Sequence, residues 1–145
     1  MTVRAAAKEA AALPVKGGDG MTVKEIIETA QRLKPSQYTT DDMLRWFNDK
    51  EGRIFEVIIK THEGAPEARE RYTEETWDAQ PFAAGPYEGL YLNWLFAQMD
   101  YHNAEEERYN NHILMHDELM GMFRAWYNQN HMPLTGPQIR NYRGW

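Results

Sequence analysis

The chain has 145 residues, of which 42% are hydrophobic and 26% are charged, so we expect a single domain with one hydrophobic core. It contains no cysteine, which excludes a disulfide framework and a thiolate zinc site. The net charge of −6 argues against broad phosphate binding, since nucleic-acid sites need clustered Lys and Arg. Without a long apolar run or a cleavable apolar leader, we expect a soluble protein.

The charges are unevenly distributed along the chain. Residues 1–20 carry three basic and two acidic side chains, and residues 132–145 carry two arginines and no acid. The residues between them hold eleven basic and twenty acidic side chains. An acidic body with near-neutral or basic ends could pair the ends of one copy with the body of another.

The beginning of the chain predicts an arm followed by a short helix. Residues 1–20 start with an Ala-rich stretch and then meet proline and glycine residues, so we expect a flexible N-terminal arm. Within residues 21–33, Thr22 and Glu25 have the spacing of a capping box, and apolar residues follow at helical intervals. The proline after Lys34 ends this helix, because a residue that precedes proline is pushed out of the helical region.

A second helix is predicted over residues 38–63. Thr39 or Thr40 is its N-cap, and two aspartates follow in the first turn, where acidic side chains are favourable. One face carries the apolar side chains Met43, Trp46, Phe47, Ile54, Val57 and Ile58. Gly52 inside the helix marks either close packing or a break.

Residues 64–86 form a long insert between the second and third helices. The insert contains two glycines, three prolines and many charges, and it follows neither the helical nor the strand period. We expect a long loop or a hairpin. Loops of this length in compact domains are usually functional or ordered by a partner.

The second half predicts one or two long helices. From Tyr87 onward the side chains are apolar nearly all round, which is typical of a helix buried on most sides. Asn103 and Glu106 repeat the cap spacing, so either a new helix begins there or one long helix kinks. From Tyr109 another apolar stripe continues to the residues before His131.

These elements together predict an all-α fold. We expect a small bundle of three to four helices with the long insert and with extended terminal arms. The helical domain is assigned to residues 21–132, and residues 133–145 form a C-terminal tail that is too short and broken to fold alone.

Two histidines four residues apart, His112 and His116, raise the question of a metal site. Further polar side chains continue this stripe at three- and four-residue steps: His102, Glu105, Glu106 and Tyr109. Such spacing can hold zinc or iron. However, the His-Glu-x-x-His motif and the Glu-x-x-His repeats of di-iron bundles are missing. The alternative is a polar stripe that faces solvent or another subunit.

Catalysis and cofactor binding are not expected. Capping and solvation explain the adjacent acidic pairs, and no phosphate-binding glycine loop, nucleophile elbow or catalytic triad is present. The aromatic content is high, and several aromatic residues lie in segments that cannot bury them locally. We predict an assembly interface formed by these side chains and nearby arginines: Tyr72, Trp77, Phe82, Arg140, Tyr142, Arg143 and Trp145.

Several short motifs occur in an order typical of one protein family. They are Leu-Lys-Pro-x-x-Tyr from Leu33, Leu44 followed by Glu-Gly-Arg-Ile at 51–54, Pro-Tyr-x-x-Leu-Tyr from Pro86, Asp-Tyr-His-Asn and Arg-Tyr-Asn-Asn between Asp100 and Asn111, and Tyr-Asn-x-x-His-Met-Pro from Tyr127. As a set they cover nearly everything after Met21. The chain resembles the head–tail connector (adaptor or neck) proteins of tailed bacteriophages and prophages.

The likeness has limits at both ends and at the histidine pair. The arm 1–20 is not expected in that family, and the tail after Pro133 is not covered by the motifs. His112 and His116 fall where the family pattern is variable, which weighs against the metal hypothesis.

The resemblance implies a virion structural protein that joins the capsid portal to the tail. Its subunits would form a closed ring, commonly twelvefold, in the virion neck after assembly in the host cytoplasm. Its partners would be copies of itself, the portal protein and tail or neck proteins. DNA would be a transiting cargo of packaging without sequence-specific binding, and no membrane would be involved.

Two other classes stay open. One is a small helical metal-binding protein that uses His112, His116 and Glu106. The other is a regulatory helical module that binds a partner protein through the second helix.

Overall fold

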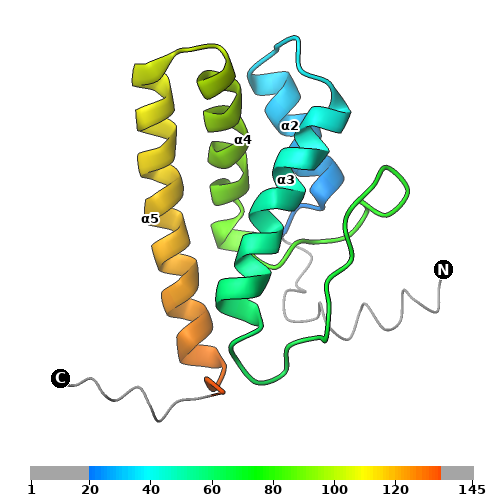
Figure 1. Cartoon of the computed structure of the whole chain (residues 1–145), viewed down its shortest axis with the longest axis vertical. Helices are drawn as coiled ribbons and strands as arrows, with labels where there is room; N and C mark the ends of the chain where they lie inside the picture. Colours follow the sequence, from blue (N-terminus) through cyan, green and yellow to red (C-terminus); the bar gives the residue numbers. More distant parts are fainter. Residues whose placement is uncertain (1–19, 135–145) are drawn as a thin grey trace.

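The protein is seen in a computed structural model that describes residues 20–134 (Figure 1). The expectations for the N-terminal arm and for most of the C-terminal tail lie outside these residues. Residues 20–134 contain four α-helices: α2 Val23–Leu33, α3 Thr40–Ile54, α4 Gly89–His102 and α5 Glu106–Asn130. A π-helical turn, η2 Phe55–Ile59, continues α3, and a 3-10 turn, η3 Gly85–Tyr87, precedes α4. No strand forms between residues 20 and 134, so the all-α prediction is confirmed.

Capping boxes begin the first two described helices. The sequence predicted the box at Thr22 and Glu25, and of the two N-caps proposed for the second helix the structure selects Thr39. The Thr22 hydroxyl accepts from the Glu25 backbone N–H at 3.1 Å, and the Glu25 carboxylate accepts from the Thr22 N–H at 3.0 Å. Thr39 and Asp42 form the same reciprocal pair at 3.2 and 3.0 Å. Each box satisfies two backbone groups at the helix start. Lys34 is the C-cap of α2, at the place set by the following proline.

The end of the second helix differs from the prediction. The α-helix passes through Gly52 without a break and then changes to the π-helical turn, in which the Lys60 N–H bonds to the Phe55 carbonyl at 2.8 Å. A π-turn contains one more residue than an α-turn. The side chains in and after it therefore no longer recur at the 3.6-residue spacing of the preceding α-helix. Ile59 is therefore buried, whereas Val57, predicted on the buried face, is 49% exposed.

The central helix of the bundle is α4. It packs against α2, α3 and α5, and in Figure 1 it lies between α5 and α3. Its buried apolar side chains are Leu90, Tyr91, Leu95, Ala97 and Met99. This position confirms the prediction that an all-round apolar helix is buried on most sides.

The turn between α4 and α5 shows that the second half forms two helices. Asn103 is the C-cap of α4 and not the N-cap of α5, so the capping role predicted for it is wrong. Its side-chain oxygen instead accepts a hydrogen bond from the Tyr38 hydroxyl at 2.7 Å. The next residue, Ala104, has φ of 60°, a left-handed conformation that helps to reverse the chain.

The long insert is an irregular loop and not a hairpin. In Figure 1 it lies beside α3, on the side away from α5. The carbonyls of Ala79 and Trp77 accept from the N–H groups of Val23 and Lys24 at 2.9 and 3.0 Å. Free N–H groups at a helix start need such acceptors. The insert therefore completes the first turn of α2.

The left-handed alanine gives a test of the interhelical turn. Ala104→Gly should raise the free energy of unfolding by about 1 kcal/mol, because a left-handed conformation is costly for a residue with a Cβ. Urea denaturation followed by circular dichroism measures the change. Ala125→Gly, on the exposed face of α5, is the control. It should lower the free energy of unfolding by about 1 kcal/mol. Destabilisation by both substitutions would contradict the assigned turn.

Candidate functional site

A fully buried carboxylate, Glu51 on α3, connects the insert to the helices. It accepts hydrogen bonds from the Tyr91 hydroxyl at 2.5 Å, the Phe82 backbone N–H at 2.9 Å and the Tyr72 hydroxyl at 3.2 Å. Burial raises the pKa of Glu51, while the bonds from Tyr91 and Phe82 and the nearby Arg69 charge favour its ionised form. One side chain thus links α3 with α4 and with two points of the insert.

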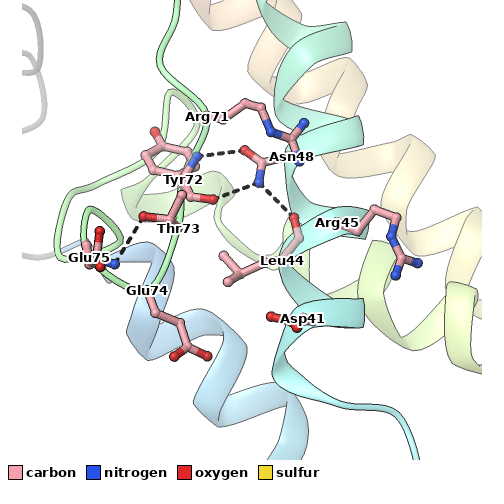
Figure 2. A pocket seen from close by; sticks show the side chains of 9 residues that line it. All are labelled: Asp41, Leu44, Arg45, Asn48, Arg71, Tyr72, Thr73, Glu74 and Glu75. Carbon is pink, nitrogen blue, oxygen red and sulfur yellow. Dashed lines mark hydrogen bonds between the residues drawn. The ribbon is translucent and has the colours of Figure 1, made fainter.

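A second anchor is the buried amide of Asn48, one turn before Glu51. Its Nδ2 donates to the Tyr72 carbonyl at 3.0 Å, and its Oδ1 accepts from the Tyr72 N–H at 2.9 Å (Figure 2). Arg69 Nη2 donates to the same Oδ1 at 2.6 Å. The side chain therefore pairs with the backbone of Tyr72 as a neighbouring strand would.

Beside this anchor lies an open hollow of about 540 Å³ (Figure 2). It is lined by Asp41, Leu44, Arg45, Asn48, Arg71, Tyr72, Thr73, Glu74 and Glu75. The lining mixes two arginines and three carboxylates around Leu44 and Tyr72. Such an open, mixed-charge surface has the composition of a protein-contact rim more than that of a catalytic cleft.

The predicted interface aromatics of the insert are partly buried within the subunit. Tyr72 packs on Phe47 with ring centroids 5.9 Å apart, and Phe82 packs on Phe55 at 6.0 Å. Trp77 also packs against the core. The premise that this segment cannot bury its aromatic rings is therefore wrong, because Asn48 and Glu51 hold the segment on α3. Their role in assembly stays a prediction. The other members of the predicted interface, Arg140, Tyr142, Arg143 and Trp145, lie outside the described residues.

His112 belongs to a network that joins three helices. Its Nδ1 lies 2.6 Å from Oδ2 of Asp100, which is fully buried on α4. The other oxygen of Asp100 lies 3.1 Å from Lys34 Nζ, at the end of α2. The carboxylate is therefore shared between a histidine and an ammonium group, which suits a structural link.

His116 has a different environment, beside Trp94 and Lys50. The His116 and Trp94 rings lie 5.5 Å apart, and Lys50 Nζ lies 4.2 Å from the centre of the same indole, a cation–π contact. Burial and the Lys50 charge lower the pKa of His116, although its Nδ1 bonds to Asp117 at 3.0 Å. Burial lowers the pKa of Lys50 to about 8.

The predicted histidine stripe does not assemble a metal site in the part of the chain that the structure describes. His112 and His116 bond to different carboxylates, and Glu106 is exposed at the start of α5. Among residues 20–134, no group of three or more His, Cys, Asp or Glu side chains could hold a metal ion. The metal hypothesis therefore has no ligand set in these residues.

The longest of the described helices, α5, exposes apolar side chains that sequence reasoning missed. Of its 25 residues only His116, Phe123 and Tyr127 are buried. Leu114, Met115 and Met122 are 69%, 53% and 51% exposed. A helix turns about 100° per residue, which places these three with Gly121 and Ala125 on one side, largely opposite the buried set. We call Leu114, Met115, Gly121, Met122 and Ala125 the α5 outer face.

Comparison with protein-family models, curated proteins and solved structures finds no match to this chain. Within residues 20–134, no helix is long and apolar enough to cross a membrane. A functional assignment therefore depends on the residues and their geometry.

Replacing the buried carboxylate tests its role in holding the insert. Glu51→Leu should lower the free energy of unfolding by about 3 kcal/mol, because it leaves the Phe82 N–H and the Tyr91 hydroxyl buried without an acceptor. Tyr72→Phe removes only one of the hydrogen-bond donors to Glu51 and should lower the free energy of unfolding by about 1 kcal/mol. Chemical denaturation measures both values. Equal, small losses would show that the carboxylate is not the anchor described.

The buried lysine predicts a rise in stability at alkaline pH. The pKa of Lys50 is about 8 in the folded chain against 10.5 in the unfolded chain, so the unfolded chain binds more protons between these values. Stability contributed by this residue should therefore increase from pH 8 to pH 10.5. Lys50→Met should abolish the increase and raise the free energy of unfolding at pH 7 by up to about 3 kcal/mol.

The control for this prediction is an exposed lysine. Within residues 20–134, Lys60 pairs with Glu56 one turn away, and both side chains are exposed, so Lys60→Met should change stability by less than about 0.5 kcal/mol. Thermal melts of the three proteins from pH 7 to pH 10 give the comparison. Parallel pH profiles for wild type and Lys50→Met would contradict the prediction.

Proposed function

We propose that this chain is a virion structural protein, a ring-forming head–tail adaptor that joins the portal to the tail of a bacteriophage. The observation that carries the proposal is the α5 outer face. The core is complete on the other side of α5, yet three large apolar side chains stay in solvent. Exposed apolar patches on small proteins mark interaction sites. A second copy of the chain, arranged around a closed ring, would cover this face.

The motifs behind the family resemblance support the proposal by contacting one another. Tyr38 of the first motif bonds to Asn103 of the fourth at 2.7 Å, and Lys34 pairs with Asp100 of the same two motifs at 3.1 Å. Glu51 of the second motif bonds to Tyr91 of the third at 2.5 Å. The motifs are therefore the residues that join the helices, as expected of a fingerprint that specifies one fold.

The charge distribution suits a channel through which DNA passes. The net charge is −6, and the acidic side chains concentrate in the helical body. Like charge discourages phosphate binding, so transiting DNA would not adhere to the walls. The proposal accordingly includes no sequence-specific DNA contact.

Imaging of the assembled protein and of virus particles tests this function. The full-length chain, alone or with its portal protein, should form closed rings visible by electron microscopy, and antibody against it should label the neck of virions. A chain truncated after Pro133 should keep its helical circular dichroism but assemble poorly, because it lacks an aromatic and basic segment. Normal, DNA-filled particles in a virus without this protein would refute the proposal.

A further inference from the structure

We infer that the α5 outer face of one copy binds the C-terminal segment, residues 135–145, of a neighbouring copy. The inference rests on the self-association in the proposed function and goes further by naming the two surfaces that meet. It depends on four observations: the exposure of the face, a glycine within it, the composition of the tail, and the point from which the tail departs.

The face is an apolar strip, interrupted by one charged side chain, that the described part of the chain leaves uncovered. Leu114 and Met122 lie about 12 Å apart along the helix axis, given a rise of about 1.5 Å per residue. Residues 114 and 115 form one end of the strip and residues 121, 122 and 125 the other. Exposed Glu118 lies between them on the same side. A matching partner is therefore short, apolar and positively charged.

Gly121 lies beside Met122 in the C-terminal part of this strip without a packing reason inside the subunit. A Cβ added there would meet no atom within 4 Å. Glycine is unfavourable inside a helix, so the described contacts do not explain its presence. The missing side chain does allow another backbone to approach the helix closely.

The C-terminal segment has the complementary composition. Residues 135–145 contain Ile139, Tyr142 and Trp145 as large apolar side chains, two arginines and no acidic residue. Arginine side chains can pair with Glu118 while the aromatic rings cover the apolar strip. Aromatic and arginine residues are also the types enriched where interfaces gain most of their affinity.

The departure point of the tail favours a neighbour over the same chain. The Leu134 N–H bonds to the Thr61 carbonyl at 3.0 Å, and Pro133 pairs with His62, whose ring packs on the buried Tyr127 of α5. The tail therefore leaves from the buried side of α5. To cover the strip of its own subunit, the tail would need about 16 Å of chain to pass around half the circumference of α5. It would need about 24 Å more to extend along the helix axis to Leu114. Eleven residues span at most about 40 Å. The chain's own tail would thus reach the far end of the strip only when fully extended, whereas a neighbour's tail has no such constraint.

Substitutions on the face should weaken association without destabilising the subunit. In the full-length protein, Leu114→Glu and Met122→Glu should weaken self-association at least tenfold by mass photometry, with unchanged circular dichroism and Tm, because both positions are exposed. Gly121→Ala should raise Tm and still weaken association. Leu33→Glu changes an equally exposed apolar residue on α2 and is the matched control. Normal association of the three α5 variants would overturn the inference.

Cross-linking identifies the occupant directly, since the chain has no native cysteine. A Leu114→Cys protein and a Trp145→Cys protein that differ in mass are mixed, assembled and treated with a short bis-maleimide. A product joining the two different chains supports the inference. A third protein carries both cysteine substitutions in one chain. A product that forms only within that single chain overturns the inference. Glu28→Cys replaces Leu114→Cys as the control and should give no product.

The results also separate this inference from the proposed function. Rings that form normally but show no 114–145 cross-link would overturn the inference and leave the adaptor function standing. Failure of the wild-type chain to self-associate, with or without its portal, would overturn both.

Discussion

The fold depends on the hydrogen bonds that surround the Glu51 carboxylate. Removing a carboxylate from water costs several kcal/mol unless donors replace the lost hydration. The donors come from α4 and from two positions of the insert. The carboxylate on α3 is therefore satisfied only when α4 and both of these positions are in place. The insert is thus a structural part of the bundle. This explains how an irregular segment can complete the first turn of α2 and bury its own aromatic rings.

The sequence predicted those features that depend on local interactions. The helix start at Thr22 follows from a hydroxyl and a carboxylate three residues apart, the start at Thr39 or Thr40 from a capping hydroxyl before two aspartates, and the end of α2 from a proline. The burial of Glu51 could not be predicted in the same way. It lies between Lys50 and Gly52 in a polar stretch, and its donors are 21 to 40 residues away. Only the tertiary arrangement shows that it is an anchor.

The α5 outer face was missed for a related reason. Lone aromatics in the insert looked unburied because their partners are distant, whereas α5 looked finished because it has one good apolar stripe. In fact α5 carries apolar residues on two sides, and the stripe through Phe123 and Tyr127 faces the core. The second side, through Leu114 and Met122, could have been noticed from its helical spacing. Its exposure becomes evident only when the structure shows nothing packed on it.

The proposed ring would require that this helix keep a fixed orientation in the subunit. The angle between successive copies decides whether a chain of heterologous contacts closes, so the contact surface must not rotate within the subunit. Near its start α5 is joined to α4 by His112 and Asp100, at 2.6 Å. Near its end Asn128 lies 2.7 Å from His62 Nε2, beyond the π-turn of α3. Polar contacts at both ends, about 24 Å apart along the axis, prevent α5 from turning about itself. In the proposed ring these part-buried polar pairs would serve assembly indirectly, because they keep the exposed apolar face at a constant angle to the body.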